Sequence, residues 1–392
     1  MIFVVFLGVL LSSFSVSQSS EPVCGHEVNE SMVLDEGLGQ CLGQGLEIVS
    51  DDVLLDCRGN DVVGYTNSSS GIVADSVENV TVRNCNINGF YSGIVFDGVN
   101  NSQLVNVSSN SNFASGISLE KSHGNRVEGS EANGNWDGIF LENSTNNTIV
   151  DNSAHRNKID AVHLFYGSFN NTVRNNDLTE NKGHGVAPAV CGNVIEDNLA
   201  GAGGSVKYVQ NAEDVSVEDT SFYSEIIFCN VNNSVIANVT IENSELNNDG
   251  ILLVNSNNNT VRDSYFRDVR TGVYLFRSSD NNKVIGNSIY SSDLGIRIRK
   301  DSKNNLVAGN QVVNTTSYLK AVKNSNENRF SKNNLSGYKF SFINNESFNM
   351  TAPAEFMGDK GLSVLEEESF DYRGLLVVVL GSISLLVGRK VI

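Results

Sequence analysis

The chain has 392 residues, with 45 acidic against 27 basic side chains, 35 Gly, 3 Pro and 54 Asn. Asn and Gly favour turns, so this composition argues against a mainly helical protein. A formal charge of −18 without a cluster of Lys and Arg excludes a nucleic-acid-binding surface, which needs basic side chains against phosphates.

Residues 1–20 are typical of a secretory signal peptide. Met1 to Leu11 are apolar, and the Ser-rich stretch that follows contains Ser15-Val16-Ser17, which suits cleavage beside small residues. The positive residues that usually begin such a signal are missing. The sequence still predicts an exported protein, in which disulfides are permitted.

The six cysteines fall into three groups along the chain. Cys24 and Cys41 bracket a short segment, 21–44, which we expect to form an N-terminal cap closed by a disulfide. Cys57 and Cys85 occupy similar points of consecutive repeats and are a second candidate pair. For the last two cysteines, a disulfide and two buried thiols both remain open, because sequence alone does not fix connectivity.

From Gly45 to Gly337 the chain repeats one motif about every 22 residues. A Gly is followed by alternating apolar residues, and another apolar residue comes about eleven positions later, after a polar turn. One copy has no neighbour to cover its apolar face, so the copies must stack. We therefore predict an all-β solenoid of about 12 coils with parallel strands ~4.8 Å apart. Examples of the motif are Gly93-Ile-Val-Phe, Gly116-Ile-Ser-Leu, Gly138-Ile-Phe-Leu and Gly250-Ile-Leu-Leu.

The first coils resemble those of right-handed parallel β-helix proteins of the NosD-like and carbohydrate-active groups. The similar residues are Val53-Leu54-Leu55-Asp56-Cys57-Arg58-Gly59, Asn79-Val80-Thr81-Val82-Arg83-Asn84-Cys85 and Gly93-Ile94. The resemblance covers about three quarters of the chain and implies a single right-handed parallel β-helix. It does not fix the function, because the group includes lyases, hydrolases, epimerases and adhesins. The copper role in the NosD name lacks support, since no Met cluster or His-x-His pair is present.

Acidic residues recur four positions after the Gly, where side chains point outward because a strand alternates its faces. Stacking predicts a carboxylate ladder of Asp75, Asp97, Glu120 and Glu142, which ends at Phe165. Stacked carboxylates repel one another unless they are solvated, protonated or bridged by a cation. The ladder is therefore either a solvated acidic face or a Ca²⁺ site formed by Asp97, Glu120 and Glu142.

A second column lies one residue before the Gly, where Asp137, Asp160 and His184 follow in three successive coils. Two carboxylates and a His suit glycoside chemistry, in which one acid protonates the leaving oxygen and the other activates water or attacks. The set resembles the polygalacturonase active site. That resemblance implies Asp137 and Asp160 as acid and base, with His184 as their support. The side chains expected nearby to bind substrate are Trp136, Phe140, Lys158, His163, Phe165 and Lys182.

This column also departs from the polygalacturonase pattern. Ile159 replaces the first acid of a paired Asp, and no Arg-Ile-Lys follows within two coils. Asp249-Gly250-Ile251 repeats the Asp-Gly-Ile pattern, but no His follows in the next coil. This second copy indicates that Asp before Gly is also favoured simply as a turn. A structural turn role therefore remains open beside catalysis. A lyase or C5-epimerase variant also remains open, with Lys158 or His163 as base and a cation on the ladder.

A basic patch at Arg297, Arg299 and Lys300 lies late in the repeat, near Tyr274 and Arg277. It either binds an anionic glycan or is a solvated strand face.

Fifteen Asn-x-Ser/Thr sequences invite a prediction of glycosylation. Several of them fall in the turn of the repeat, where Asn is already favoured. The better candidates lie outside that register, at Asn29, Asn314, Asn345 and Asn349.

The end of the chain is typical of a membrane anchor. A polar stalk, 338–373, precedes an uncharged apolar run within 374–392 that acidic residues flank on one side and Arg389-Lys390 on the other. This pattern predicts a transmembrane helix with nearly the whole chain outside the cytoplasm. The run is short for a bilayer, so a buried C-terminal helix or strand is the alternative.

These features predict an exported, membrane-anchored protein that binds or scaffolds extracellular polysaccharide or contacts another cell-surface component. We expect that no cofactor is required, although Ca²⁺ is a candidate for a bound ion. We expect no nucleic-acid partner. The alternative is a hydrolase, lyase or C5-epimerase that acts on acidic, uronate-containing glycans.

Overall fold

The computed structural model describes residues 22–65, 69–322, 325, 327–336, 341–343 and 350–351. In this part of the chain all regular structure is β-sheet, wound into a solenoid of about 13 turns, in agreement with the all-β prediction. Within the same residues, no helix is long and apolar enough to span a bilayer. The predicted signal peptide and anchor lie outside the described residues.

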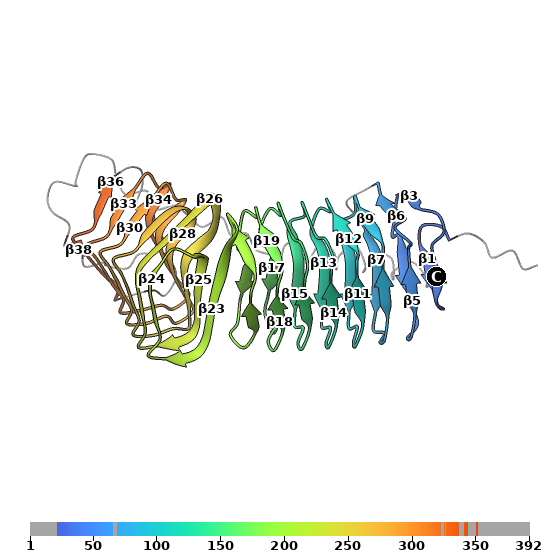
Figure 1. The fold of residues 1–392 in the computed structure, drawn as a ribbon, viewed down its shortest axis with the longest axis horizontal. Helices are drawn as coiled ribbons and strands as arrows, with labels where there is room; N and C mark the ends of the chain where they lie inside the picture. The colour runs from blue at the N-terminus through green and yellow to red at the C-terminus, as the bar shows by residue number, and fades with distance from the viewer. Residues whose placement is uncertain are drawn as a thin grey trace, which may run out of the picture.

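Three sheets run along the first section of the rod, from His26 to Gly201 (Figure 1). Sheet A consists of β1 (His26–Val28), β4 (Leu46–Ile48), β7 (Ser70–Asp75), β10 (Ser92–Asp97), β13 (Ser115–Glu120), β15 (Asp137–Glu142), β17 (Val162–Leu164) and β20 (Val186–Pro188). Sheet B consists of β2 (Met32–Val33), β5 (Leu54–Asp56), β8 (Thr81–Arg83), β11 (Gln103–Val105), β14 (Arg126–Glu128), β16 (Thr148–Val150), β18 (Thr172–Arg174) and β21 (Val194–Glu196). Sheet C consists of β3 (Leu38–Cys41), β6 (Asp61–Gly64), β9 (Asn86–Asn88) and β12 (Ser108–Asn110).

The second section, from Gly204 to Thr351, belongs to one 18-stranded sheet, which also takes in β19 (Asp177–Thr179) and β22 (Leu199–Gly201). The regular stack changes at β22, because this strand pairs antiparallel with β23. The strands of the second section are β23 (Gly204–Glu213), β24 (Ser216–Thr220), β25 (Tyr223–Asn232), β26 (Val235–Val254), β27 (Thr260–Arg262), β28 (Tyr265–Phe276), β29 (Lys283–Ile285), β30 (Ser288–Tyr290), β31 (Leu294–Arg299), β32 (Leu306–Ala308), β33 (Gln311–Val313), β34 (Ser317–Val322), β35 (Arg329–Ser331), β36 (Asn334–Ser336), β37 (Ser341–Ile343) and β38 (Met350–Thr351).

The Gly of each repeat is required by the close approach of neighbouring coils. A Cβ atom on Gly138 would lie 2.5 Å from the carbonyl oxygen of Ala161 in the next coil. Because that oxygen belongs to the backbone, it cannot turn away from a larger side chain. The recurrence of Gly therefore reports packing between coils.

Buried Asn side chains form ladders along the rod, and these account for much of the Asn content. The Oδ1 atom of Asn157 accepts a hydrogen bond from the backbone N–H of Asn135 at 2.8 Å. In the next coil, Oδ1 of Asn181 accepts one from the backbone N–H of Asn157 at 2.9 Å. These side chains are at most 2% exposed. Each ladder satisfies backbone groups that the turns would otherwise leave buried and unpaired.

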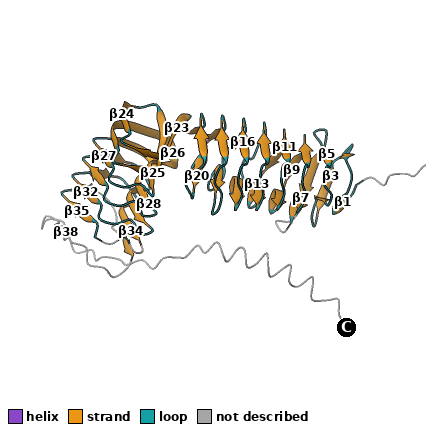
Figure 2. Cartoon of the chain, turned by 90° about the horizontal axis from the view of Figure 1, so that it is seen from below, coloured by secondary structure: helices purple, strands orange, loops and turns teal. Residues whose placement is uncertain are grey.

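The rod bends where the first section meets the second (Figures 1 and 2). In Figure 2 the second section turns towards the side on which β7, β13 and β20 of sheet A lie. Ile227 and Leu252 of the second section belong to the hydrophobic core of the first, whereas their chain neighbours Ile226 and Ile251 belong to a separate core. The outward faces of β25 and β26 therefore cover the end of the first section.

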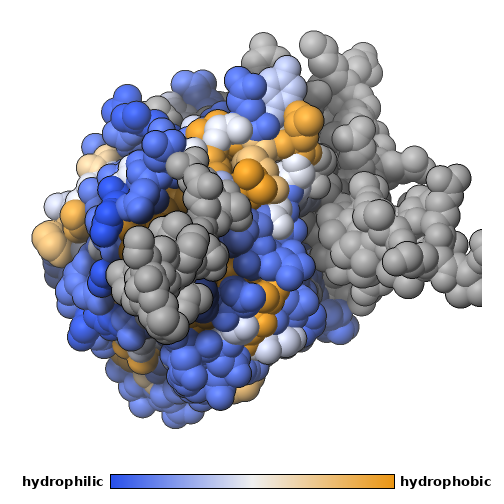
Figure 3. All heavy atoms as spheres, turned by 90° about the vertical axis from the view of Figure 1, so that its right-hand side faces the viewer, coloured by the Kyte–Doolittle hydropathy of each residue, from blue (hydrophilic) through white to orange (hydrophobic). Residues whose placement is uncertain are grey.

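The solenoid is longer than the repeat spacing indicates. β1 pairs in parallel with β4, with His26 opposite Leu46, so residues of the predicted cap already form a coil. At the other end, β37 and β38 continue the stack into the predicted stalk. Seen from its N-terminal end, the described surface is mostly hydrophilic, with scattered apolar patches (Figure 3).

Candidate functional site

Asp137, Asp160 and His184 stack in one column, as the repeat predicts. The Oδ1 atom of Asp137 accepts the backbone N–H of Asp160 at 3.0 Å. In the next coil, Oδ1 of Asp160 accepts the backbone N–H of His184 at 2.7 Å. Both carboxylates are at most 5% exposed. One oxygen of each carboxylate is thus fixed by the coil above it, and the other oxygen, Oδ2, is left for other contacts.

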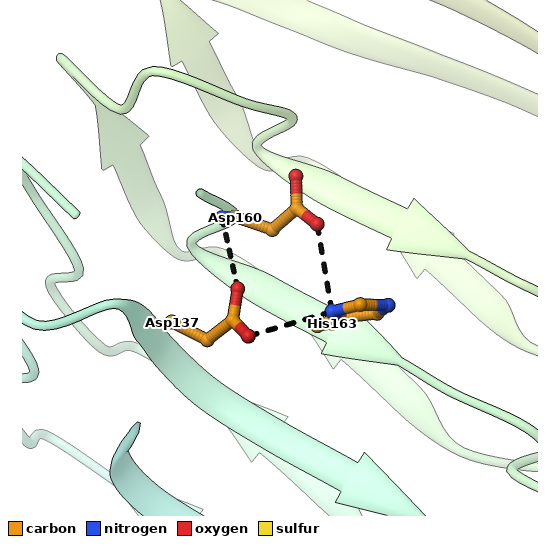
Figure 4. Close-up of side chains that lie close together, drawn as sticks. All are labelled: Asp137, Asp160 and His163. Atoms are coloured by element: carbon orange, nitrogen blue, oxygen red, sulfur yellow. Dashed lines mark hydrogen bonds and ion pairs between the residues drawn. The ribbon is translucent and has the colours of Figure 1, made fainter. Parts of the chain in front are cut away.

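The remaining carboxylate oxygens face His163 (Figure 4). His163 lies at the centre of β17, on its outward side, and its Nδ1 is 3.6 Å from Oδ2 of Asp137 and 3.5 Å from Oδ2 of Asp160. This Nδ1 is buried and has no hydrogen-bond partner among the described residues. The figure shows the other ring nitrogen pointing away from both carboxylates. His163, predicted as a substrate-binding residue, is therefore part of the carboxylate cluster itself.

Two aromatic rings hold His163 in place. Phe140 and Phe165 each pack edge-on against the imidazole, with ring centroids 5.4 Å away. Burial lowers the pKa of His163, but the Asp137 and Asp160 carboxylates outweigh it and raise this pKa above that of an ordinary imidazole. The cluster therefore favours a positive charge or a cation at this position.

The side chain of His184 does not join this cluster. Its Nδ1 lies 2.7 Å from Oε1 of Glu225, and Nη2 of Arg270 contacts its Nε2. Arg270 also pairs with Asp249 at 3.2 Å. Burial raises the pKa of Glu225, although the charges of His184 and Arg270 oppose this effect. His184 thus contacts the two aspartates only through its backbone N–H, which donates to Asp160. Its ring instead lies at the junction between the two sections.

Glu225, Asp249 and Arg270 were not predicted as site residues. The sequence signal for Asp249 is present in Asp249-Gly250-Ile251, but it is indistinguishable from turn chemistry. Glu225 reaches His184 across 41 residues, and Arg270 reaches it across 86 residues. Their contacts depend on the bend of the rod, which no local pattern specifies.

The bend brings basic side chains of the second section to the aromatic end of β17. Lys300 donates to the phenol oxygen of Tyr166 at 3.1 Å, and the guanidinium of Arg277 lies 4.8 Å from the centroid of the same ring. Arg277 also donates to the backbone carbonyl of Ala189. We call the region between the outward faces of β15 and β17 and those of β28 and β31 the corner.

Arg297 of β31 lies on the second-section side of the corner. Its guanidinium is 4.8 Å from the ring centroid of Tyr274, and its Nε is buried with no hydrogen-bond partner in the described part of the chain. Burial and the nearby Arg299 and Arg270 lower the pKa of Arg297. A buried donor among like charges favours the binding of an anion, because burying an unpaired charge is costly.

The other predicted substrate-binding side chains lie beside the cluster. Trp136 is half-buried in the turn before β15, and Lys158 and Lys182 are exposed. The Nζ atom of Lys158 lies 5.9 Å from the ring centroid of Phe113, which in turn packs on Tyr91. Among the described residues neither lysine forms an ion pair with the cluster, so both are at its margin.

The carboxylate ladder forms in the predicted register, with Asp97 opposite Asp75 and Glu120, and Glu142 opposite Glu120. Burial raises the pKa of Glu120, and the neighbouring carboxylates add to this effect. Lys121 pairs with Asp97 at 3.1 Å. Within the described chain, the ladder oxygens do not converge as the two His-carboxylate clusters do. Ca²⁺ binding by the ladder stays a prediction.

The structure contains three disulfides, Cys24–Cys41, Cys57–Cys85 and Cys191–Cys229. The first two confirm the predicted pairs. The third decides between the two alternatives left open, and it joins the first section to the second.

Of the glycosylation candidates, Asn29 and Asn314 are exposed, and Asn345 and Asn349 lie outside the described residues. Asn146, which lies within the register of the repeat, is also exposed, with a φ of 59°. Glycosylation stays a prediction at all of these positions.

No curated protein matches the sequence. Similar solved structures include the A-module of the mannuronan C-5 epimerase AlgE6 from Azotobacter vinelandii, 15% identical with a TM-score of 0.40, covering 82% of this chain and 92% of that one. An alginate lyase from Paenibacillus sp. strain FPU-7 is 11% identical with a TM-score of 0.37, covering 80% and 98%. The receptor-binding protein of bacteriophage Det7 is 12% identical with a TM-score of 0.37, covering 84% and 76%.

Two family matches divide the rod near its bend. Residues 48–200 match the family described as right handed beta helix region, and residues 189–350 match the periplasmic copper-binding protein family NosD.

The described residues do not fit a copper site of the usual kind. All six cysteines are in disulfides, and each cluster of metal-ligating groups there contains a single His. The disulfides and the periplasmic family are typical of an extracytoplasmic protein. The stacked coils and the two matches together make the chain a right-handed parallel β-helix repeat protein whose C-terminal part is NosD-like.

Proposed function

We propose that this protein binds an acidic polysaccharide at the corner of its bent β-helix, outside the cytoplasm. The observation that carries the proposal is the state of Arg297. Its Nε is buried without a hydrogen-bond partner among the residues that the structure describes, and Arg299 and Arg270 lie near it. Asp249 pairs with Arg270 and neutralises its charge, so the positive charge of Arg297 favours the binding of an anion from outside the protein. A uronate carboxylate supplies that anion, and charge-assisted hydrogen bonds to it are among the stronger ones.

The aromatic side chains of the corner fit a sugar chain. Phe140, Phe165 and Tyr166 form a continuous row, with ring centroids 5.9 Å and 4.7 Å apart. Aromatic rings offer apolar faces that pack on the C–H groups of pyranose rings, while an Arg holds the carboxylate. The same corner thus offers both contacts that an acidic glycan needs.

The test measures binding of full-length protein to polyuronate oligosaccharides and to neutral oligosaccharides of equal length, by calorimetry at two salt concentrations. We expect binding to the polyuronates only, weakened by salt. Arg297→Ala should lose about tenfold to 100-fold in affinity, the equivalent of one charge-assisted hydrogen bond. Arg174→Ala, an exposed Arg on sheet B, is the matched control. Equal affinity for both sugar classes, or an unchanged affinity in Arg297→Ala, would refute the proposal.

A second candidate function is cleavage or C5 epimerisation of the bound chain. It is favoured by the position of Asp137, Asp160 and His163 beside the same aromatic row. Full-length protein and Asp160→Asn would be incubated with uronate polymers, with and without Ca²⁺, while reducing ends, unsaturated products and C5 stereochemistry are followed. Asn keeps an oxygen for the backbone N–H of His184, so the coil contact survives. Absence of product, or equal product from both proteins, would exclude catalysis at this cluster.

Anchoring at a cell surface through residues 374–392 belongs to the same proposal. Its test is the partition of the full chain between membrane and soluble fractions after alkaline extraction. We expect the chain in the membrane fraction, and its release by alkali would refute the anchor.

A further inference from the structure

We propose that Asp137, Asp160 and His163 bind one divalent metal ion of the Zn²⁺ or Mn²⁺ class, through Nδ1 of the imidazole and Oδ2 of each carboxylate. This inference goes beyond polysaccharide binding, because it concerns the free protein.

The distances within the cluster fit a shared metal better than hydrogen bonds. Nδ1 of His163 lies 3.6 Å and 3.5 Å from the two Oδ2 atoms, beyond the 2.7–3.2 Å of ordinary N–H···O bonds. Two ligands that bind one ion at about 2.0–2.2 Å in tetrahedral geometry lie about 3.3–3.6 Å from each other. The two observed separations between nitrogen and oxygen agree with that spacing.

The burial of His163 points the same way. Its Nδ1 is buried and has no hydrogen-bond partner within the described ranges, while the side chain as a whole is 13% exposed. An unsatisfied buried nitrogen costs about 1–3 kcal/mol. The two carboxylates beside it carry like charges, and one oxygen of each lies with a ring nitrogen of His163 in a group of atoms within 4.8 Å of one another. One divalent cation satisfies the nitrogen and neutralises both carboxylates.

The cluster is already organised for such an ion. Backbone N–H groups of the next coils hold Oδ1 of Asp137 and of Asp160, which directs both Oδ2 atoms at the ring. Phe140 and Phe165 fix the ring from two sides. Outer contacts of this kind orient the ligands of protein metal sites. The three ligands come from two stacked coils, so no large rearrangement is needed on binding.

The ligand set selects the class of metal. Ca²⁺ takes six to eight oxygen ligands, whereas this site offers one nitrogen and two carboxylates. A mixed set of imidazole and carboxylate suits Zn²⁺ or Mn²⁺ and leaves coordination positions open. The other cluster of this kind, at His184, Glu225 and Asp249, differs because the guanidinium of Arg270 already contacts His184 and Asp249.

The test uses the full chain stripped with EDTA and titrated separately with Zn²⁺, Mn²⁺ and Ca²⁺, without polysaccharide. We expect one Zn²⁺ or Mn²⁺ per chain by calorimetry and elemental analysis. His163→Gln and Asp137→Asn should each weaken the affinity about 100-fold or more. The amide oxygen that Asp137→Asn introduces still accepts the N–H of Asp160, so the contact between coils is kept. His155→Gln, a half-buried His near Asp177 on another face, is the matched control and should bind like the wild type.

Two results would overturn the metal site. One is the absence of stoichiometric Zn²⁺ and Mn²⁺ binding by a folded wild-type chain. The other is equal binding by wild type and His163→Gln, with circular dichroism showing that both retain their β structure. Arg297→Ala separates this site from the polysaccharide proposal, because it should weaken sugar binding and leave metal binding unchanged.

Discussion

Replacing one buried Asn of a ladder should destabilise the rod far more than replacing an Asn at its surface. Asn157 is the sharpest case, because it is 0% exposed and its side chain makes three hydrogen bonds. Its Oδ1 accepts from the backbone N–H of Asn135 at 2.8 Å. Its Nδ2 donates to the carbonyl of Ala132 at 3.0 Å and to Oδ1 of Asn181 at 2.9 Å.

The magnitude follows from the groups that Asn157→Ala leaves behind. The N–H of Asn135 and the carbonyl of Ala132 lose these bonds in a place that water does not reach. Oδ1 of Asn181 keeps the backbone N–H of residue 157. At about 1–3 kcal/mol for each unsatisfied group, two groups predict a loss of about 4 kcal/mol. Asn88→Ala is the control, because Asn88 is half-exposed; it should cost about 0.5 kcal/mol or less.

The assay is urea unfolding of both full-length variants, followed by circular dichroism and by hydrogen exchange of the peptide that contains Asn135. We expect a lower midpoint and faster exchange at Asn135 in Asn157→Ala alone. The reasoning fails if the two variants differ by less than about 1 kcal/mol, or if exchange at Asn135 is unchanged. Either result would mean that ladder bonds are replaced without cost.

Three further predictions concern the disulfides, the acid response and the Gly column. Cys191→Ser should destabilise the chain by about 4 kcal/mol, the loop entropy of a 38-residue separation, and calorimetry of wild type and variant measures this. Hydrogen bonds from Asn84 and from the backbone N–H of Arg58 lower the pKa of Asp56. The Asp56 carboxylate therefore stabilises the fold fully above the pKa that it has in the unfolded chain, and this stabilisation is lost as the pH falls through its pKa in the folded chain. Melting temperatures from pH 7 to pH 2 should therefore fall more steeply in wild type than in Asp56→Asn, and parallel curves would contradict this. Gly138→Val should cost about 3 kcal/mol in urea unfolding, because its Cβ would collide with a backbone oxygen.

The sequence was sufficient to predict the coil, because every coil must bury the same apolar side chains and pack its backbone against its neighbours in the same way. Gly before an apolar alternation marks a close approach of backbones, and a polar turn follows at a fixed distance. The first coil was missed because β1, β2 and β3 carry no Gly-Ile motif, although His26 stacks on Leu46 like its later counterparts. Register within sheet A followed from the same spacing, as the pairing of Ile94 with Ile117 shows.

The candidate site was only partly predictable, because its chemistry depends on side-chain direction and on contacts between distant segments. Spacing placed Asp137, Asp160 and the backbone of His184 in one column. It did not indicate that His163 turns Nδ1 towards both carboxylates, or that the ring of His184 turns away to Glu225.

The missing information is the bend, and its cause lies in outward-facing residues that a straight rod would expose. In the first section the outward position two residues after the repeat Gly is half-exposed at Phe140 and His163. In the second section the same position carries Leu252 and Tyr274, which are 4% and 6% exposed. Burying a large apolar side chain stabilises a fold by about 1.5–3 kcal/mol, so docking these residues on the end of the first section favours the bent form. Arg297 occupies the next place in the same outward column, one coil beyond the docked surface. The burial that bends the rod therefore also brings the guanidinium of Arg297 to the corner.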